Sequence, residues 1–84
     1  MKENKVNVDL IVPNIGERFN IFIPVNKTVG EVIVILNKVI NEIDNKFPIT
    51  NNLSIYDVIE NKIYDLDIEI KNTSIKNGTI LALI

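Results

Sequence analysis

The sequence predicts a small α+β domain in which one helix packs on one face of a mixed sheet. Three observations lead to this fold class: a helical period over residues 28–44, strand-like alternation over 5–12 and 18–25, and an unbroken apolar run at 79–84. The 84 residues, 46% hydrophobic and 24% charged, suit a single core. We therefore expect one domain over residues 1–84, with residues 1–4 disordered.

The stretch from Thr28 to Asp44 has the strongest local pattern in the chain. Its apolar residues recur at the spacing that lines one side of a helix, namely Val29, Val32, Ile33, Leu36, Val39, Ile40 and Ile43. Thr28 and Glu31 form a capping box, because the threonine hydroxyl can accept the Glu31 N–H while the glutamate accepts the Thr28 N–H. The helix should therefore begin at Val29.

Two strands joined by a short turn are predicted before the helix. Residues 5–12 and 18–25 both alternate between apolar and other side chains, as half-buried strands do. The Pro-Asn-Ile-Gly sequence at 13–16 favours a chain reversal between them. Because proline cannot donate to a ladder, Pro24 indicates that the second strand lies at an edge of the sheet. Such an edge can pair with another strand, so the oligomeric state stays open.

A second hairpin is predicted after the helix, whose pattern ends before Pro48. Residues 53–60 are rich in β-branched and aromatic types, and a turn at 60–62 leads to a short strand at 63–64. Phe47 and Ile49 are expected to close one end of the core.

The register of this second hairpin has two solutions. Either Ile55 and Ile59 face inward with Asp57 between them, or Tyr56 and Val58 face inward. Asp57 breaks the alternation in both cases. We favour the solution with Ile55 inward and Val58 outward.

The remaining chain is a connection followed by a final strand. The connection at 65–75 has the apolar anchors Leu66, Ile68, Ile70 and Ile75, and Asn77-Gly78 is a turn signal. The run at 79–84 is typical of a strand covered on much of both faces. If it lies parallel to the first strand at the centre of the sheet, the ββαββ order, with 63–64 as a further short strand, is that of a β-grasp.

The final strand also predicts a candidate binding surface. With Leu81 and Leu83 facing the helix, the other sheet face carries Ile80, Ala82 and Ile84 beside Val58. This face is either an exposed apolar patch, the usual mark of a partner site, or it is covered by Tyr56 or a loop.

The composition argues against catalysis and against several binding functions. The chain has no histidine and no cysteine, so the commonest general base, zinc ligands and catalytic dyads are absent. Its three glycines are isolated, which disfavours a phosphate-binding loop. The carboxylates of Asp65, Asp67 and Glu69 fail as a calcium loop, since Ile70 replaces the required glycine. We expect no enzyme activity, no cofactor and no metal site.

The charge and hydropathy pattern limits the class of partner. A net charge of −2 with scattered lysines gives no basic stripe for nucleic acid. No apolar run exceeds five residues, too few to cross a bilayer, and no export signal follows the charged start. The sequence therefore predicts a cytoplasmic protein that binds neither nucleic acid nor the membrane interior.

The order of elements and the ending SIKNGTILALI resemble ubiquitin-like proteins. Length and terminal design are similar to the bacterial YukD and EsaB type, which is associated with type VII secretion. The residues that carry the resemblance are the 55–64 hairpin, Ile75, Asn77-Gly78 and the leucines at 81 and 83. It implies the β-grasp fold over residues 5–84 and a protein-binding role beside the cytoplasmic part of a membrane secretion complex.

The resemblance also names candidate contact residues. Val58 corresponds by position to the exposed isoleucine of ubiquitin's recognition patch, and Lys62 to the turn lysine after it; Asp57 departs from the apolar residue expected beside Val58. Val58 and Lys62, together with Ile80, Ala82 and Ile84, form the predicted protein-binding set.

Ubiquitin and the sulfur carriers act through a Gly-Gly tail, which this sequence lacks. The expected function is thus a non-conjugated adaptor; the alternatives are a sulfur carrier or modifier without its tail, or a β-grasp domain with another partner.

Overall fold

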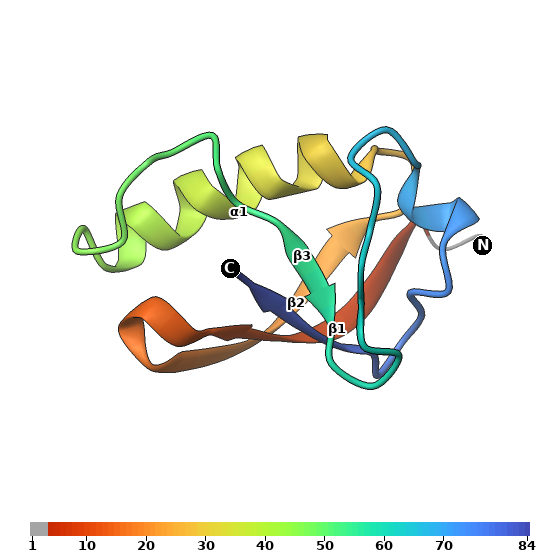
Figure 1. Cartoon of the computed structure of the whole chain (residues 1–84), viewed down its shortest axis with the longest axis horizontal. Helices are drawn as coiled ribbons and strands as arrows, with labels where there is room; N and C mark the ends of the chain where they lie inside the picture. The colour runs from red at the N-terminus through yellow and green to blue at the C-terminus, as the bar shows by residue number, and fades with distance from the viewer. Residues whose placement is uncertain (1–3) are drawn as a thin grey trace.

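The computed structural model describes residues 4–84 and consists of one helix on a five-stranded sheet (Figure 1). The elements are β1 (Lys5–Val12), β2 (Glu17–Pro24), α1 (Val29–Ile43), β3 (Ile55–Asp57), β4 (Lys62–Ile63) and β5 (Ile80–Leu83), with single 3-10 turns η1 (Pro13–Ile15) and η2 (Ile70–Asn72). The strand order is β2-β1-β5-β3-β4, and only β1 and β5 pair in parallel. The predicted α+β class, the central last strand and the edge position of β2 are confirmed.

The core lies between α1 and one face of the sheet. Alternate residues of β1 are buried there, and the register places the inward residues of β2, β5 and β3 beside them. The largest fully buried side chains of the sheet are Leu10, Ile23, Ile55, Leu81 and Leu83. The predicted inward position of Leu81, Leu83 and Ile55 is therefore confirmed.

The start of α1 is held by its own cap and by a distant loop. The Thr28 hydroxyl accepts the Glu31 N–H at 3.1 Å, and Glu31 Oε1 accepts the Thr28 N–H at 2.9 Å, as predicted. The next two N–H groups donate to that loop: Val29 to the Ile68 carbonyl at 2.8 Å and Gly30 to the Leu66 carbonyl at 2.9 Å. The first turn of the helix is thus satisfied by the segment that follows β4.

Gly30 permits this close approach of the loop. A Cβ at this position would lie 3.2 Å from the Leu66 carbonyl oxygen, tighter than most contacts of this kind. A glycine near the start of a helix otherwise costs stability relative to alanine.

The segment after α1 differs from the prediction at Ile49. Phe47 is 1% exposed and belongs to the core, but Ile49 is 62% exposed, so its predicted core position was wrong. The cause is the buried side chain of Asn37, which donates to the Pro48 carbonyl and accepts the Thr50 N–H. These bonds fix the segment against the helix with Ile49 turned outward.

Three further predictions need correction or restriction. The strand expected over 53–60 covers only 55–57, and Ile59 lies in the following turn, 74% exposed. Ile70 and Ile75 are buried anchors, whereas Leu66 and Ile68 are 50% and 38% exposed. Disorder was predicted for residues 1–4, of which residues 1–3 lie outside the described residues. Asn4 is described, and its carbonyl accepts the Val25 N–H at 2.9 Å.

Candidate protein-interaction surfaces

The sheet face opposite α1 carries the predicted contact residues and is mostly apolar where it crosses β5, β3 and β4. A row of neighbouring residues runs across four strands: Ile11, Ala82, Tyr56 and Ile63. A second row joins Ile80 to Val58, whose N–H donates to the Ile80 carbonyl at 3.1 Å. We call these residues, together with Ile84, the outer sheet face.

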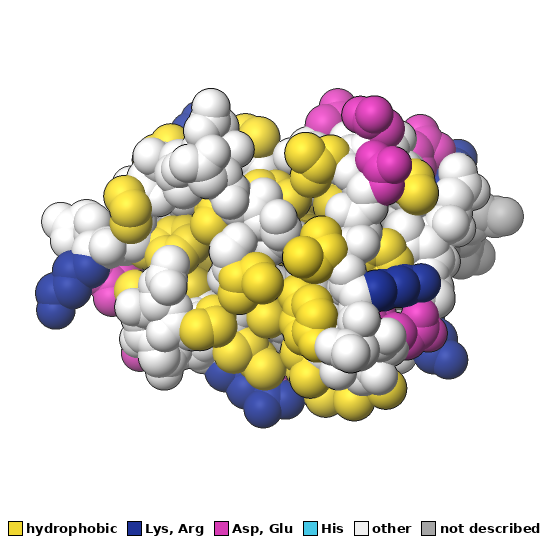
Figure 2. Space-filling view, in the orientation of Figure 1, with side chains coloured by type: hydrophobic (Ala, Val, Ile, Leu, Met, Phe, Trp, Pro, Cys, Tyr) yellow, Lys and Arg dark blue, Asp and Glu magenta, His cyan; other side chains and the backbone are white. Residues whose placement is uncertain are grey.

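The exposure of the outer sheet face is uneven. Val58 is 37% exposed, Ile84 45% and Ile63 59%, while Ile80 is half-buried. Ala82, also predicted as a contact residue, is only 7% exposed and offers little surface of its own. Its methyl group lies between the larger Ile11 and Tyr56 on the adjacent strands, which cover it. Figure 2 shows hydrophobic side chains gathered over β3 and the C-terminal strand.

Lys62 and Ile63 lie on opposite sides of β4. The Lys62 ammonium is 3.1 Å from Glu60 Oε1 and 5.0 Å from the centre of the Tyr64 ring, which belongs to the buried side. Ile63, which the sequence analysis did not select, is the β4 residue beside Tyr56. The alternation of the strand could have identified Ile63, because successive side chains point to opposite faces and its neighbour Tyr64 is buried. Lys62 therefore lies on the other side of β4 from the outer sheet face and borders that face only at the edge of the sheet.

Asp57 is a buried carboxylate at the end of β3. It is 2% exposed, and its Oδ1 accepts the Ile59 and Glu60 N–H groups at 3.1 and 2.9 Å. The Tyr64 hydroxyl donates to Oδ2 at 2.8 Å and also contacts Ser74 Oγ at 2.8 Å. The residue that interrupted the sequence pattern thus closes the turn between β3 and β4 and links it to the segment after η2.

The surroundings of Asp57 and Tyr64 determine the ionisation state of each side chain. Burial by itself raises the pKa of Asp57, but the N–H of Glu60, the Tyr64 hydroxyl and the N–H of Ile59 together lower the pKa below its usual value. Burial, with the facing Asp57 charge, raises the pKa of Tyr64 to about 12. At neutral pH the pair is a carboxylate facing a neutral phenol, which stabilises the turn and offers no exposed acid or base for catalysis.

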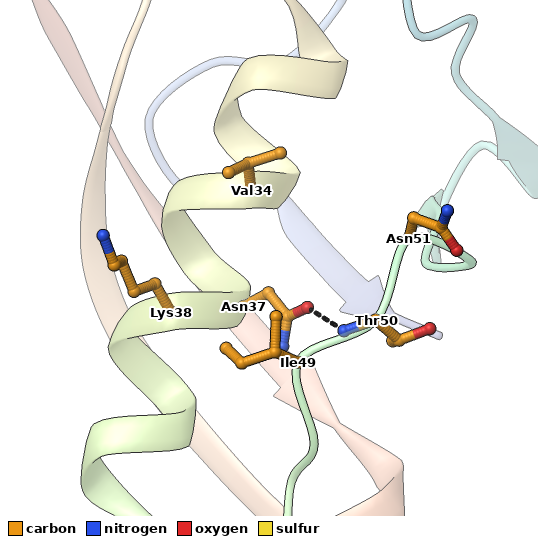
Figure 3. A pocket seen from close by; sticks show the side chains of 6 residues that line it. All are labelled: Val34, Asn37, Lys38, Ile49, Thr50 and Asn51. Atoms are coloured by element: carbon orange, nitrogen blue, oxygen red, sulfur yellow. Dashed lines mark hydrogen bonds between the residues drawn. The ribbon is translucent and has the colours of Figure 1, made fainter.

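A second apolar surface lies on the helix side of the molecule. It is a groove of about 710 Å³ between α1 and the segment after it, lined by Val34, Asn37, Lys38, Ile49, Thr50 and Asn51. Figure 3 shows Asn37 directed at Thr50 and hydrogen-bonded to it, with Lys38 extending away from that segment. The residues that line the groove include one cation, Lys38, and no carboxylate.

The described chain has neither a metal cluster nor a helix suited to a membrane. Among residues 4–84, no three potential ligands come close enough to hold a metal ion. The same residues include no helix with the length and hydrophobicity that crossing a bilayer requires. Asp65 and Asp67 are exposed, and Glu69 lies 3.5 Å from Lys71 in an ion pair.

Comparison with solved structures identifies the architecture. The ubiquitin-like domain of the Mycobacterium tuberculosis type VII secretion system protein EccD1 superimposes with a TM-score of 0.73 at 12% identity, over 98% of this chain and 99% of that one. The ubiquitin-like domain of an Arabidopsis thaliana protein gives a TM-score of 0.65 at 17% identity, over 98% and 78% of the two chains. The fold is the ubiquitin-like β-grasp.

A chain of a larger assembly is similar to this protein over part of its length. A chain of the MycP5-free ESX-5 inner membrane complex gives a TM-score of 0.80 at 15% identity; the match covers 98% of this ubiquitin-like chain but only 21% of that one. No protein-family model matches the sequence, and no curated protein matches it. One of these similar structures is thus a type VII secretion protein, and another is a chain of an inner membrane complex.

Proposed function

We propose that this protein is a non-conjugated ubiquitin-like adaptor that binds a protein partner in a type VII secretion system, through the outer sheet face. The observation that carries the proposal is the contiguous apolar surface of Val58, Ile63 and Ile84, each between 37% and 59% exposed, around the half-buried Tyr56. Contiguous apolar surface of this kind on a small domain marks an interaction site.

The surface suits a partner with an apolar centre and a polar rim. Buried aromatic and aliphatic side chains supply most of the affinity at such interfaces, while charged groups act at the rim. The Lys62–Glu60 pair borders the face at β4, and Arg18, 3.6 Å from Asp9, borders it at β2. Both pairs are exposed, so they contribute to orientation more than to affinity.

The similarity to EccD1 and to the ESX-5 complex supports the choice of secretion machinery. We propose that the partner is the cytoplasmic part of a membrane component, and that the protein is a cytoplasmic, YukD/EsaB-like accessory subunit without catalytic activity.

The test measures binding of purified protein to the cytoplasmic segments of the secretion membrane components by titration calorimetry. Ile63→Asp places a charge on the outer sheet face and should weaken binding at least about tenfold, the usual effect of losing a central contact. Ile49→Asp is a matched control, since Ile49 is 62% exposed against 59% for Ile63 but lies on the helix side. It should bind like wild type.

Circular dichroism of both variants checks that they fold. Equal affinity of wild type and Ile63→Asp for a bound segment would remove the outer sheet face from the proposal. If none of the secretion segments binds wild type, the assignment to type VII secretion fails instead.

A further inference from the structure

The outer edge of β2 is the one long strand edge that the described sheet leaves unpaired. β2 is the first strand in the sheet order and has eight residues, whereas β4 at the other end has two. Proteins usually protect such edges with short strands, charges or proline. The short length of β4 and the charge of Lys62 protect that edge from pairing with another strand, but most of β2 has no comparable protection.

The direction of the β2 main-chain groups follows from one hydrogen bond. The Val25 N–H donates to the Asn4 carbonyl at 2.9 Å and continues the β1–β2 register by one pair. Hydrogen-bonded and non-hydrogen-bonded pairs alternate along an antiparallel ladder. The odd-numbered residues of β2 therefore bond to β1, and the even-numbered ones direct their N–H and C=O groups away from the sheet.

The outward set consists of Arg18, Asn20, Phe22 and Pro24. Pro24, which has no N–H, is in this set, where β1 does not require one. Within residues 4–84, no main-chain bond from outside the ladder satisfies Arg18, Asn20 or Phe22. The edge thus offers three N–H donors and four carbonyl acceptors to an added strand.

The polar side chains of this edge do not block an approaching strand. Arg18 is held back toward β1 by Asp9 at 3.6 Å, and the Asn20 amide bonds to Asn7 and Asp9 at 3.0 and 2.9 Å. Phe22 is 64% exposed and free to contact a neighbour.

An apolar stripe on α1 lies on the side of this edge. Asn37 and Asn41 bond to the 47–50 segment that leads to β3, so the opposite flank of the helix faces β2. That flank carries Ile35, Val39 and Ile43, which are 39%, 45% and 61% exposed. A strand added to β2 would place its own inward side chains below this stripe.

We propose that β2 pairs with β2 of a second copy of this chain, antiparallel and centred on Asn20. In this register Asn20 faces Asn20 of the second copy, and Arg18 faces Phe22 twice. All six outward N–H and C=O groups of residues 18, 20 and 22 are then used on each copy, and Pro24 is not required to donate. Shifting the strands by two residues toward Pro24 would pair it with Arg18; that ladder has four pairs but lacks two Pro24 N–H donors, so it also forms six bonds and the choice between the registers rests on the side chains.

Side-chain chemistry favours the register centred on Asn20. Arg18 beside Phe22 of the second copy is a cation facing an aromatic ring, and the two-fold axis makes the contact twice. On the inner side, Phe19 lies next to Ile21 of the second copy, below the helix stripe, and both are half-buried in one copy. The resulting ten-stranded sheet presents both outer sheet faces on the same side.

The first test measures dimerisation by analytical ultracentrifugation over roughly 5 to 500 µM, a range that covers weak association. Phe22→Lys brings two like charges together at Arg18, and Phe22→Glu forms two opposite-charge pairs there. We expect the lysine variant to dimerise at least about fourfold more weakly than the glutamate variant. Net charge alone predicts the reverse order, because the chain carries −2 and lysine makes it less negative.

The second test uses wild type and needs no variant. Hydrogen exchange of the Arg18, Asn20 and Phe22 amides should slow as protein concentration rises, whereas Phe19 and Ile21 should be protected at every concentration. A wild type that stays monomeric at every concentration overturns the proposal. Protection of these amides by a strand of another protein, without a dimer, would overturn it as well. A dimer in which these three amides exchange as in the monomer also overturns it.

Discussion

The buried carboxylate of Asp57 gives a sharp test of how the β3–β4 turn is stabilised. Asp57→Ala would leave the N–H groups of Ile59 and Glu60 and the hydroxyl of Tyr64 without their acceptor. Removing an acceptor from buried donors costs about 1 to 3 kcal/mol for each that stays unsatisfied. Since water can reach part of this turn, we expect a loss of about 3 kcal/mol, against a total of roughly 5 to 10 kcal/mol.

Asp57→Asn isolates the contribution of the charge. The amide oxygen can still accept the two N–H groups, and the Tyr64 hydroxyl can turn to donate to Ser74, which lies 2.8 Å away. Only the charge-assisted part of the bonds is lost, about 1 to 2 kcal/mol at pH 7.

The pH dependence of that difference follows from the direction of the pKa shift. The folded state lowers the pKa of Asp57 below its usual 3.8, so the stabilisation is present above that value and is lost as pH falls through the folded pKa. Urea unfolding of wild type and Asp57→Asn between pH 7 and about pH 3 should therefore show a shrinking gap. A gap that does not change with pH would refute the charge argument, and an Asp57→Ala variant as stable as wild type would refute the network.

Two further predictions concern the helix and its loop. Leu36→Ala should cost about 2 to 5 kcal/mol through a cavity in the core, while Thr28→Ala should cost about 1 kcal/mol through the lost cap; equal urea midpoints for Leu36→Ala and wild type would contradict the central position of α1. Gly30→Ala should change stability by less than about 1 kcal/mol, because the gain in helix propensity offsets the tight contact with the Leu66 carbonyl, whereas Gly30→Val should lose about 1 to 3 kcal/mol. Thermal unfolding decides this, and a valine variant as stable as wild type would show that the loop yields without cost.

The parts of the fold that depend on local chemistry could be predicted from the sequence. The capping box at Thr28, the turn at 13–16 and the alternation of β1 and β2 each need only neighbouring residues to be recognised. The central position of β5 beside β1 also followed, since an apolar run covered on much of both faces belongs at the centre of a sheet.

The errors occurred where a distant partner decides the outcome. Asp57 interrupts the predicted pattern because its partner Tyr64 is separated from it along the chain, although an aspartate that accepts the N–H groups two and three residues later is a recognisable turn signal. Ile49 counted as core because nothing local reveals that Asn37 bonds to the backbone around it. Ala82 had the correct face, but its small side chain is covered by larger neighbours.

The parallel pairing of β1 with β5 has a consequence for how the chain folds. Leu10 and Leu81 are neighbours in the sheet although they are separated by most of the sequence, so this contact forms only after a large loop closes. During synthesis, β1, β2 and α1 leave the ribosome first, and part of their apolar surface is covered only when β5 joins the same core. The domain cannot complete its core before Leu83 is available, and until then the nascent chain exposes apolar surface of the kind that promotes aggregation.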